Sequence, residues 1–161
     1  MQLTKLFSMQ RQLDSFIQNN RQQQTDVFQE KGLALLIELA ELANETRCFK
    51  FWSTKGPSAD AVILEEYVDS IHFLLSLGIE KDLHSLENWP IGEIEGELTQ
   101  LFLKTTAAIH RFLEELTMDS YEQVWVYYGA IANKLGFTNE DIIQAYIAKN
   151  EENYKRQKTG Y

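Results

Sequence analysis

The sequence is poor in cysteine and has no long apolar run. Cys48 is the only cysteine among 161 residues, so an intrachain disulfide and a cysteine-rich zinc site are both excluded. A reducing, cytoplasmic setting is therefore expected. The first residues lack a basic leader followed by an apolar stretch, and no run reaches the roughly 18 apolar residues of a membrane span. We expect neither secretion nor a membrane partner.

Basic residues are also in deficit. The chain has 15 Lys and Arg residues against 24 Asp and Glu residues, which gives a formal net charge of −9. Proteins that bind the phosphate backbone of nucleic acids rely on Lys and Arg. The charge balance therefore argues against nucleic acid as a partner.

Proline is nearly absent, with Pro57 and Pro90 as the two examples. Apolar residues recur mostly at spacings of three and four, which is the period of an amphipathic helix. The pattern predicts an all-α protein, an antiparallel helical bundle. The length is typical of one globular unit, so we expect a single domain over residues 1–161.

Six helices are expected from this periodicity. They are predicted near residues 3–16, 26–47, 58–78, 94–116, 120–135 and 138–150 or a little further. Asp26, Ser58 and Thr138 are the expected N-caps. Gly78 and Gly136 are expected to end their helices as C′ residues.

Two acidic pairs lie inside apolar stretches. Glu38 and Glu41 lie in the segment IELAELANE, and Glu66 and Asp69 lie in LEEYVDSIHFLL. A helix advances about 100° per residue, so residues three apart share one side. The remaining directions of both segments are almost entirely apolar, as in helices that pack on several sides. The carboxylates are therefore expected to face inward.

Inward-facing carboxylates repel one another and are costly to desolvate unless a cation or a proton compensates them. Carboxylate oxygens without Cys or His are the ligands that Mg²⁺ and Mn²⁺ prefer. A short loop joins the two acidic helices, so they should lie antiparallel, with acid facing acid. Geometry does not choose between Glu65 and Glu66, because both lie within about a turn of Asp69.

Other classes of protein stay open at this point. An ExxE motif is common on solvated helices, so one alternative is a non-catalytic helical interaction protein. Another is a ferritin-like carboxylate metal protein, which requires Glu-x-x-His pairs. The chain has none, and the nearest approach is Asp69 followed three residues later by His72.

The reaction that these residues favour is hydrolysis of a polyphosphate by metal-activated water. No covalent nucleophile is needed for it. The motifs GxSxG and GxxxxGK[ST] are absent, so serine nucleophiles and P-loop chemistry are not expected. Near the C-terminus, Lys149, Lys155, Arg156 and Lys158 could grip an anion and make the tail a lid over phosphates.

The ExxE motif, a loop and the ExxD motif together resemble the all-α nucleoside triphosphate pyrophosphohydrolases. Within them the chain most resembles the dimeric dUTPases. The resemblance covers essentially the whole chain, through ELAELANETRCFKFWS, EEYVDSIHFLLSLGIE and KNEENYKRQKTGY. The aromatic loop, the histidine three residues after the aspartate and the terminal KNxxNxxRQxxGY indicate the dUTP branch.

The resemblance implies Mg²⁺-dependent cleavage of dUTP to dUMP and diphosphate, which limits uracil incorporation into DNA. It also implies dUDP as a second substrate and an active site at a homodimer interface. The implied metal ligands are Glu38, Glu41, Glu66 and Asp69, with Glu66 preferred to Glu65. Ile37 stands where some relatives carry another acid, which leaves the number of metals open. Glu45 is then a candidate for activating water.

The resemblance also implies a set of substrate-binding residues. On the nucleoside side these are Gln10, which matches a uracil-recognising glutamine, with Phe51, Trp52 and His72. On the phosphate side they are Lys50, Lys149, Asn153, Arg156 and Tyr161. One alternative within the same superfamily stays open, a pyrophosphohydrolase for another nucleotide such as dCTP or a modified nucleotide.

Overall fold

The computed structural model describes residues 1–21 and 26–160. These residues form six α-helices and no β-strand, so the all-α prediction is confirmed. The helices are α1 (Thr4–Arg21), α2 (Phe28–Thr46), α3 (Asp60–Glu80), α4 (Leu98–Glu115), α5 (Met118–Leu135) and α6 (Asn139–Lys158). Among the described residues, no helix is both long enough and apolar enough to span a membrane.

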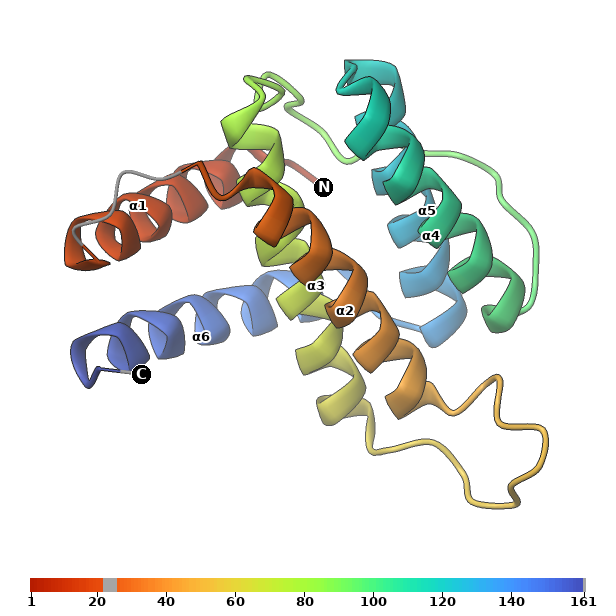
Figure 1. The fold of residues 1–161 in the computed structure, drawn as a ribbon. Helices are drawn as coiled ribbons and strands as arrows, with labels where there is room; N and C mark the ends of the chain where they lie inside the picture. The colour runs from red at the N-terminus through yellow and green to blue at the C-terminus, as the bar shows by residue number, and fades with distance from the viewer. Residues whose placement is uncertain (22–25, 161) are drawn as a thin grey trace.

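An antiparallel pair, α2 and α3, forms the centre of the bundle (Figure 1). The hairpin of α4 and α5 lies on one side of it. On the other side α1 and α6 both pack against α3 and against each other. Residues from both ends of the chain are thereby brought to the acidic segment of α3.

The core is rich in aromatic side chains, and the hydroxyls of two of its buried tyrosines form hydrogen bonds. Tyr67, Tyr121 and Trp125 are fully buried. The hydroxyl of Tyr121 donates to the carbonyl of Leu74 at 2.8 Å, and that of Tyr67 donates to the carbonyl of Tyr128 at 2.9 Å. Buried aromatic rings contribute large apolar areas, and these bonds remove the cost of burying their hydroxyls.

Two predicted boundaries of α3 are wrong. Gly78 does not end the helix but lies inside it. A glycine fits this position because Tyr121 packs so closely that a methyl group would overlap its hydroxyl. Ala59 is the N-cap in place of Ser58. The Ser58 hydroxyl donates instead to the carboxylate of Glu45, and this contact fastens the loop to the end of α2.

Other boundaries differ by a few residues. Helix α4 begins at Leu98, four residues later than predicted, where Glu97 forms a capping box. Helix α6 continues to Lys158. The predicted caps Thr138 and Gly136 are confirmed, since Thr138 accepts from the amide of Asp141 and Gly136 adopts φ of 78°.

One face of α2 does not pack as its sequence predicts. Leu33 is 61% exposed and Ile37 is 50% exposed. The apolar residues of this helix are therefore covered on one side by the rest of the chain and uncovered on the other. This uncovered face bears on the assembly proposed below.

Candidate active site

Three carboxylates meet where α2 faces α3. Glu38 from α2 and Glu66 and Asp69 from α3 each place one oxygen within 4.8 Å of the others. The ExxD spacing puts Glu66 and Asp69 on one side of α3, and the antiparallel packing brings Glu38 opposite. Oxygen ligands at this separation are suited to a hard divalent cation.

Burial and mutual repulsion both disfavour the ionised form of these carboxylates. Burial raises the pKa of Glu38 to about 7, and the charges of Asp69, Glu41 and Glu66 add to the effect. Burial is also the main cause of the raised pKa of Glu66 and of Asp69. A bound cation would favour the ionised carboxylates and so remove this cost.

Glu65 and Glu66, which geometry alone left undecided, have different partners. Glu66 lies in the carboxylate group, whereas Glu65 binds the ammonium of Lys149 at 2.7 Å. The same ammonium lies 2.8 Å from Oδ2 of Asp69. The bond from Lys149 lowers the pKa of Glu65. Lys149 from α6 thus reaches the edge of the carboxylate group.

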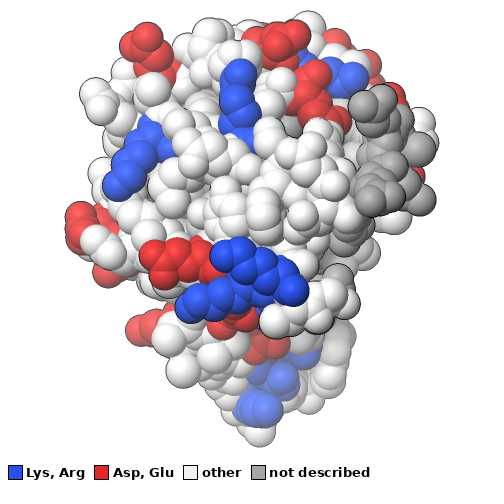
Figure 2. Space-filling view, turned by 90° about the vertical axis from the view of Figure 1, so that its left-hand side faces the viewer, with Lys and Arg blue, Asp and Glu red and all other residues white. Residues whose placement is uncertain are grey.

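A cavity of about 580 Å³ opens between α1, α2, α3 and α6 beside this group. It brings together many of the predicted residues from both ends of the chain. Its lining includes Gln10, Glu38, Asp69, His72, Lys149, Asn153 and Arg156. Lys and Arg side chains gather in a band on the face of the molecule where α6 ends (Figure 2). Three of the phosphate-side candidates therefore share one opening with two of the carboxylates, Glu38 and Asp69.

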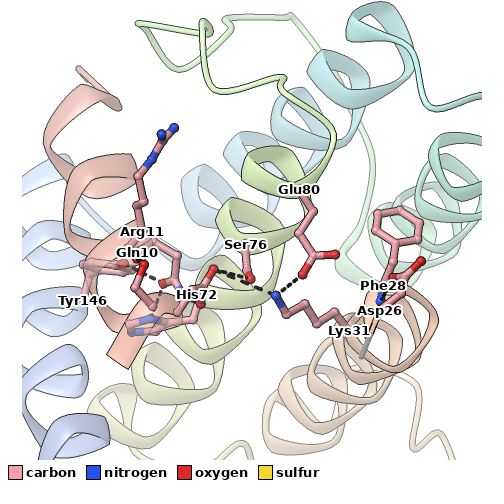
Figure 3. A network of polar contacts seen from close by, with 11 residues as sticks. Gln10, Arg11, Asp26, Phe28, Lys31, His72, Ser76, Glu80 and Tyr146 are labelled. Atoms are coloured by element: carbon pink, nitrogen blue, oxygen red, sulfur yellow. Dashed lines mark hydrogen bonds and ion pairs between the residues drawn. The ribbon is translucent and has the colours of Figure 1, made fainter. Parts of the chain in front are cut away.

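A polar network connects α1, α3 and α6, and two of its members, Gln10 and His72, line the cavity (Figure 3). Oε1 of Gln10 lies 2.8 Å from Nδ1 of His72 and accepts the hydroxyl of Tyr146 at 2.8 Å. The rings of His72 and Tyr146 stack with centroids 4.1 Å apart. Burial and the charge of Lys149 lower the pKa of His72 to about 3, so this imidazole is neutral.

The aromatic loop lies elsewhere. Residues 47–59 project from the ends of α2 and α3, away from α1 and α6 (Figure 1). Phe51 is 93% exposed and Trp52 is 66% exposed, and the described residues that line the cavity include neither of them nor Lys50. Lys50 donates instead to Oδ1 of Asn44 at 2.6 Å.

Two further predicted carboxylates also lie outside the group of three. Glu41 is exposed, although its charge raises the pKa of both Glu38 and Glu66. Glu45 accepts from Ser58 and from Asn44. Tyr161 lies outside the described residues, so its predicted closing role stays a prediction.

The model of the dUTPase family matches residues 2–161 of the chain. The chain belongs to the dUTPase family. It is accordingly a dUTP diphosphatase. A comparison with curated proteins finds no match.

Several residues of the cavity and of its polar network were not predicted from the sequence. Asp14, Ser76 and Lys31 line the cavity, and Tyr146 bonds to Gln10. One signal was available, because Asp14 follows Gln10 by four residues and so lies on the same side of a helix. The partners from α2, α3 and α6 carry no such signal, since only the tertiary packing brings them together.

Proposed function

We propose that this dUTPase hydrolyses dUTP to dUMP and diphosphate in a Mg²⁺-dependent reaction, with dUDP as a second substrate. The observation that carries the proposal is the group formed by Glu38, Glu66 and Asp69, whose oxygens are mutually within 4.8 Å in a partly buried position. Glu41, one turn along α2, is the proposed fourth ligand. Mn²⁺ is the expected substitute, because it prefers the same oxygen ligands.

A divalent cation held there would polarise the phosphate oxygens and lower the pKa of an attacking water. The nearby protein residues are proposed to bind the phosphates and to orient the water. Lys149, Asn153 and Arg156 line the cavity next to the carboxylates and are proposed to hold the phosphates. Glu45, bonded to Ser58, is a weaker candidate for orienting water.

Gln10 and His72 are proposed to read the base. Gln10 is 3% exposed and His72 is 6% exposed, and both line the cavity. Hydrogen bonds in a site of low polarity reject poorly matched bases far better than apolar contacts do. The fixed amide of Gln10 can therefore distinguish the carbonyl of uracil from the amino group of cytosine.

The active unit is proposed to be a homodimer. Leu33 and Ile37 leave an apolar face of α2 exposed. The loop of residues 47–59, which carries the exposed Phe51 and Trp52, projects from the ends of α2 and α3. Exposed apolar surface of this kind marks interaction sites. We propose that a second copy covers the α2 face and that each loop, with Lys50, closes the nucleoside side of the other subunit's cavity.

A panel of dUTP, dUDP, dCTP and dTTP tests the substrate assignment, with release of diphosphate or phosphate as the readout. We expect dUTP to give the highest kcat/KM and dUDP to be hydrolysed as well. A higher kcat/KM for dCTP would move the specificity to another base. The single domain over residues 1–161 and the cytoplasmic location stay predictions.

A further inference from the structure

The amide of Gln10 has three hydrogen-bonded neighbours, and they differ in whether they can donate or only accept a hydrogen bond. His72 can donate or accept through Nδ1, depending on its tautomer, and the hydroxyl of Tyr146 can also do either. An ionised carboxylate can only accept. Oδ1 of Asp14 lies 2.8 Å from Nε2 of Gln10, so Asp14 is the one neighbour that dictates which end of the amide faces it.

We infer that Asp14 is a positioning residue that fixes the direction of the Gln10 amide and, through it, the tautomer of His72. With Nε2 of Gln10 directed at Asp14, Oε1 must face His72 and Tyr146. A carbonyl oxygen only accepts, so Nδ1 of His72 carries the proton and Nε2 of His72 is left as an acceptor. The base-reading role of the two residues rests on the function proposed above.

The surroundings of Asp14 keep its carboxylate in place. Oδ2 accepts the hydroxyl of Ser76 at 2.6 Å and lies 4.0 Å from the ammonium of Lys31 (Figure 3). Lys31 is itself held by an ion pair with Glu80. Burial and the charge of Glu80 raise the pKa of Asp14, whereas Ser76, Lys31 and Gln10 favour the ionised form.

The direction of the Gln10 amide determines which donors and acceptors Gln10 and His72 can still offer to a base. Oε1 of Gln10 accepts two bonds and is saturated, whereas Nε2 keeps one N–H beyond the bond to Asp14. Nε2 of His72 is buried and has no partner among the described residues. Gln10 therefore offers a donor and His72 an acceptor. Uracil presents a carbonyl next to an N–H, which matches this pair, and cytosine presents the reverse.

The direct test is the ¹⁵N NMR spectrum of the imidazoles in the metal-free protein. The chain has only three histidines, and the signals of His72 can be assigned by their loss in His72→Gln. We expect a protonated Nδ1 and an unprotonated Nε2 in the wild-type protein. A protonated Nε2 in the wild type would overturn the inference, whatever any variant does.

Asp14→Asn keeps the shape of the side chain, but the new amide can donate as well as accept hydrogen bonds. Lys31 favours the new amide oxygen on its own side, so the NH₂ group turns to Gln10 and reverses its amide. We expect the proton of His72 to move to Nε2. Tyr146→Phe is the matched control, because it removes a different hydrogen bond of Gln10 and leaves Asp14 to fix the direction of the amide. In Tyr146→Phe the tautomer should stay as in the wild type.

The kinetic arm compares kcat/KM for dUTP with that for dCTP. Asp14→Asn should lower this ratio by roughly tenfold or more, the order of one hydrogen bond lost or reversed. An unchanged tautomer and an unchanged ratio in Asp14→Asn would overturn the inference. If the tautomer moves while the wild-type protein hydrolyses neither nucleotide, Asp14 is the positioning residue and the proposed function fails instead.

Discussion

Lys149 places its ammonium 2.8 Å from Oδ2 of Asp69, at the edge of the carboxylate group that we assign to the metal. The ammonium is nearly buried, with 8% of the side chain exposed, and it also binds Glu65. The ammonium of Lys149 thus neutralises part of the negative charge of the carboxylate group. A metal ion that binds Asp69 must compete with it unless Lys149 turns toward the phosphates of a nucleotide.

Replacing Lys149 by methionine should therefore have opposite effects on metal and substrate. Without nucleotide, affinity for Mn²⁺ should rise by roughly fivefold or more, because a neighbouring positive charge is removed. KM for dUTP should rise, because a phosphate contact is lost. Titration calorimetry and steady-state kinetics measure the two effects, with the exposed Lys134→Met as control. An unchanged metal affinity would contradict competition between Lys149 and the ion.

Glu65 and Glu66 form a matched pair for testing the ligand assignment. Glu66→Gln removes a proposed ligand and should lower kcat by roughly a hundredfold or more. Glu65→Gln removes only a partner of Lys149, so its effect should be much smaller and should appear mainly in KM. Steady-state kinetics at saturating Mg²⁺ checks both variants. A reversed order of the two effects would assign the ligand to Glu65.

Glu38 should make the stability of the metal-free protein depend on pH. Its pKa is raised from 4.5 to about 7, so between these values the folded protein holds a proton that the unfolded chain has released. The contribution to stability is full below about pH 4.5 and is lost as the pH rises through about 7. Tm measured with a chelator should therefore fall over this window, and Glu38→Gln should flatten the fall. A fall of Tm in Glu38→Gln as steep as in the wild-type protein would contradict this role.

The projecting loop predicts complementation between inactive variants. Trp52→Ala lacks the loop side chain, and Glu66→Gln lacks a ligand, so each homodimer should be inactive or nearly so. After random exchange of subunits, mixed dimers contain one intact site, and about a quarter of wild-type activity should return. Since Trp52 is 66% exposed, Trp52→Ala should leave Tm nearly unchanged. Absence of any recovery would place the loop and the carboxylates of each site in one subunit.

The sequence predicted the helices from local periodicity, and the short loop between α2 and α3 predicted that their acidic residues face each other. Glu38 and Asp69 could be found from apolar surroundings at helical spacing. The partners of Gln10 could not, because Asp14 is the only one on the same helix and the rest come from α3 and α6. The extent of burial was overestimated at Leu33 and Ile37. Helical periodicity does not distinguish an apolar face that packs against the same chain from an apolar face that is available to a second chain.

Release of diphosphate from dUTP, followed with Mg²⁺ and with a chelator in wild-type protein and in Glu66→Gln, tests the central claim most directly. The account predicts that the wild-type protein releases diphosphate only with Mg²⁺ and that Glu66→Gln loses nearly all of this activity. Wild-type rates in the presence of the chelator, or near-normal release by Glu66→Gln at saturating Mg²⁺, would contradict it.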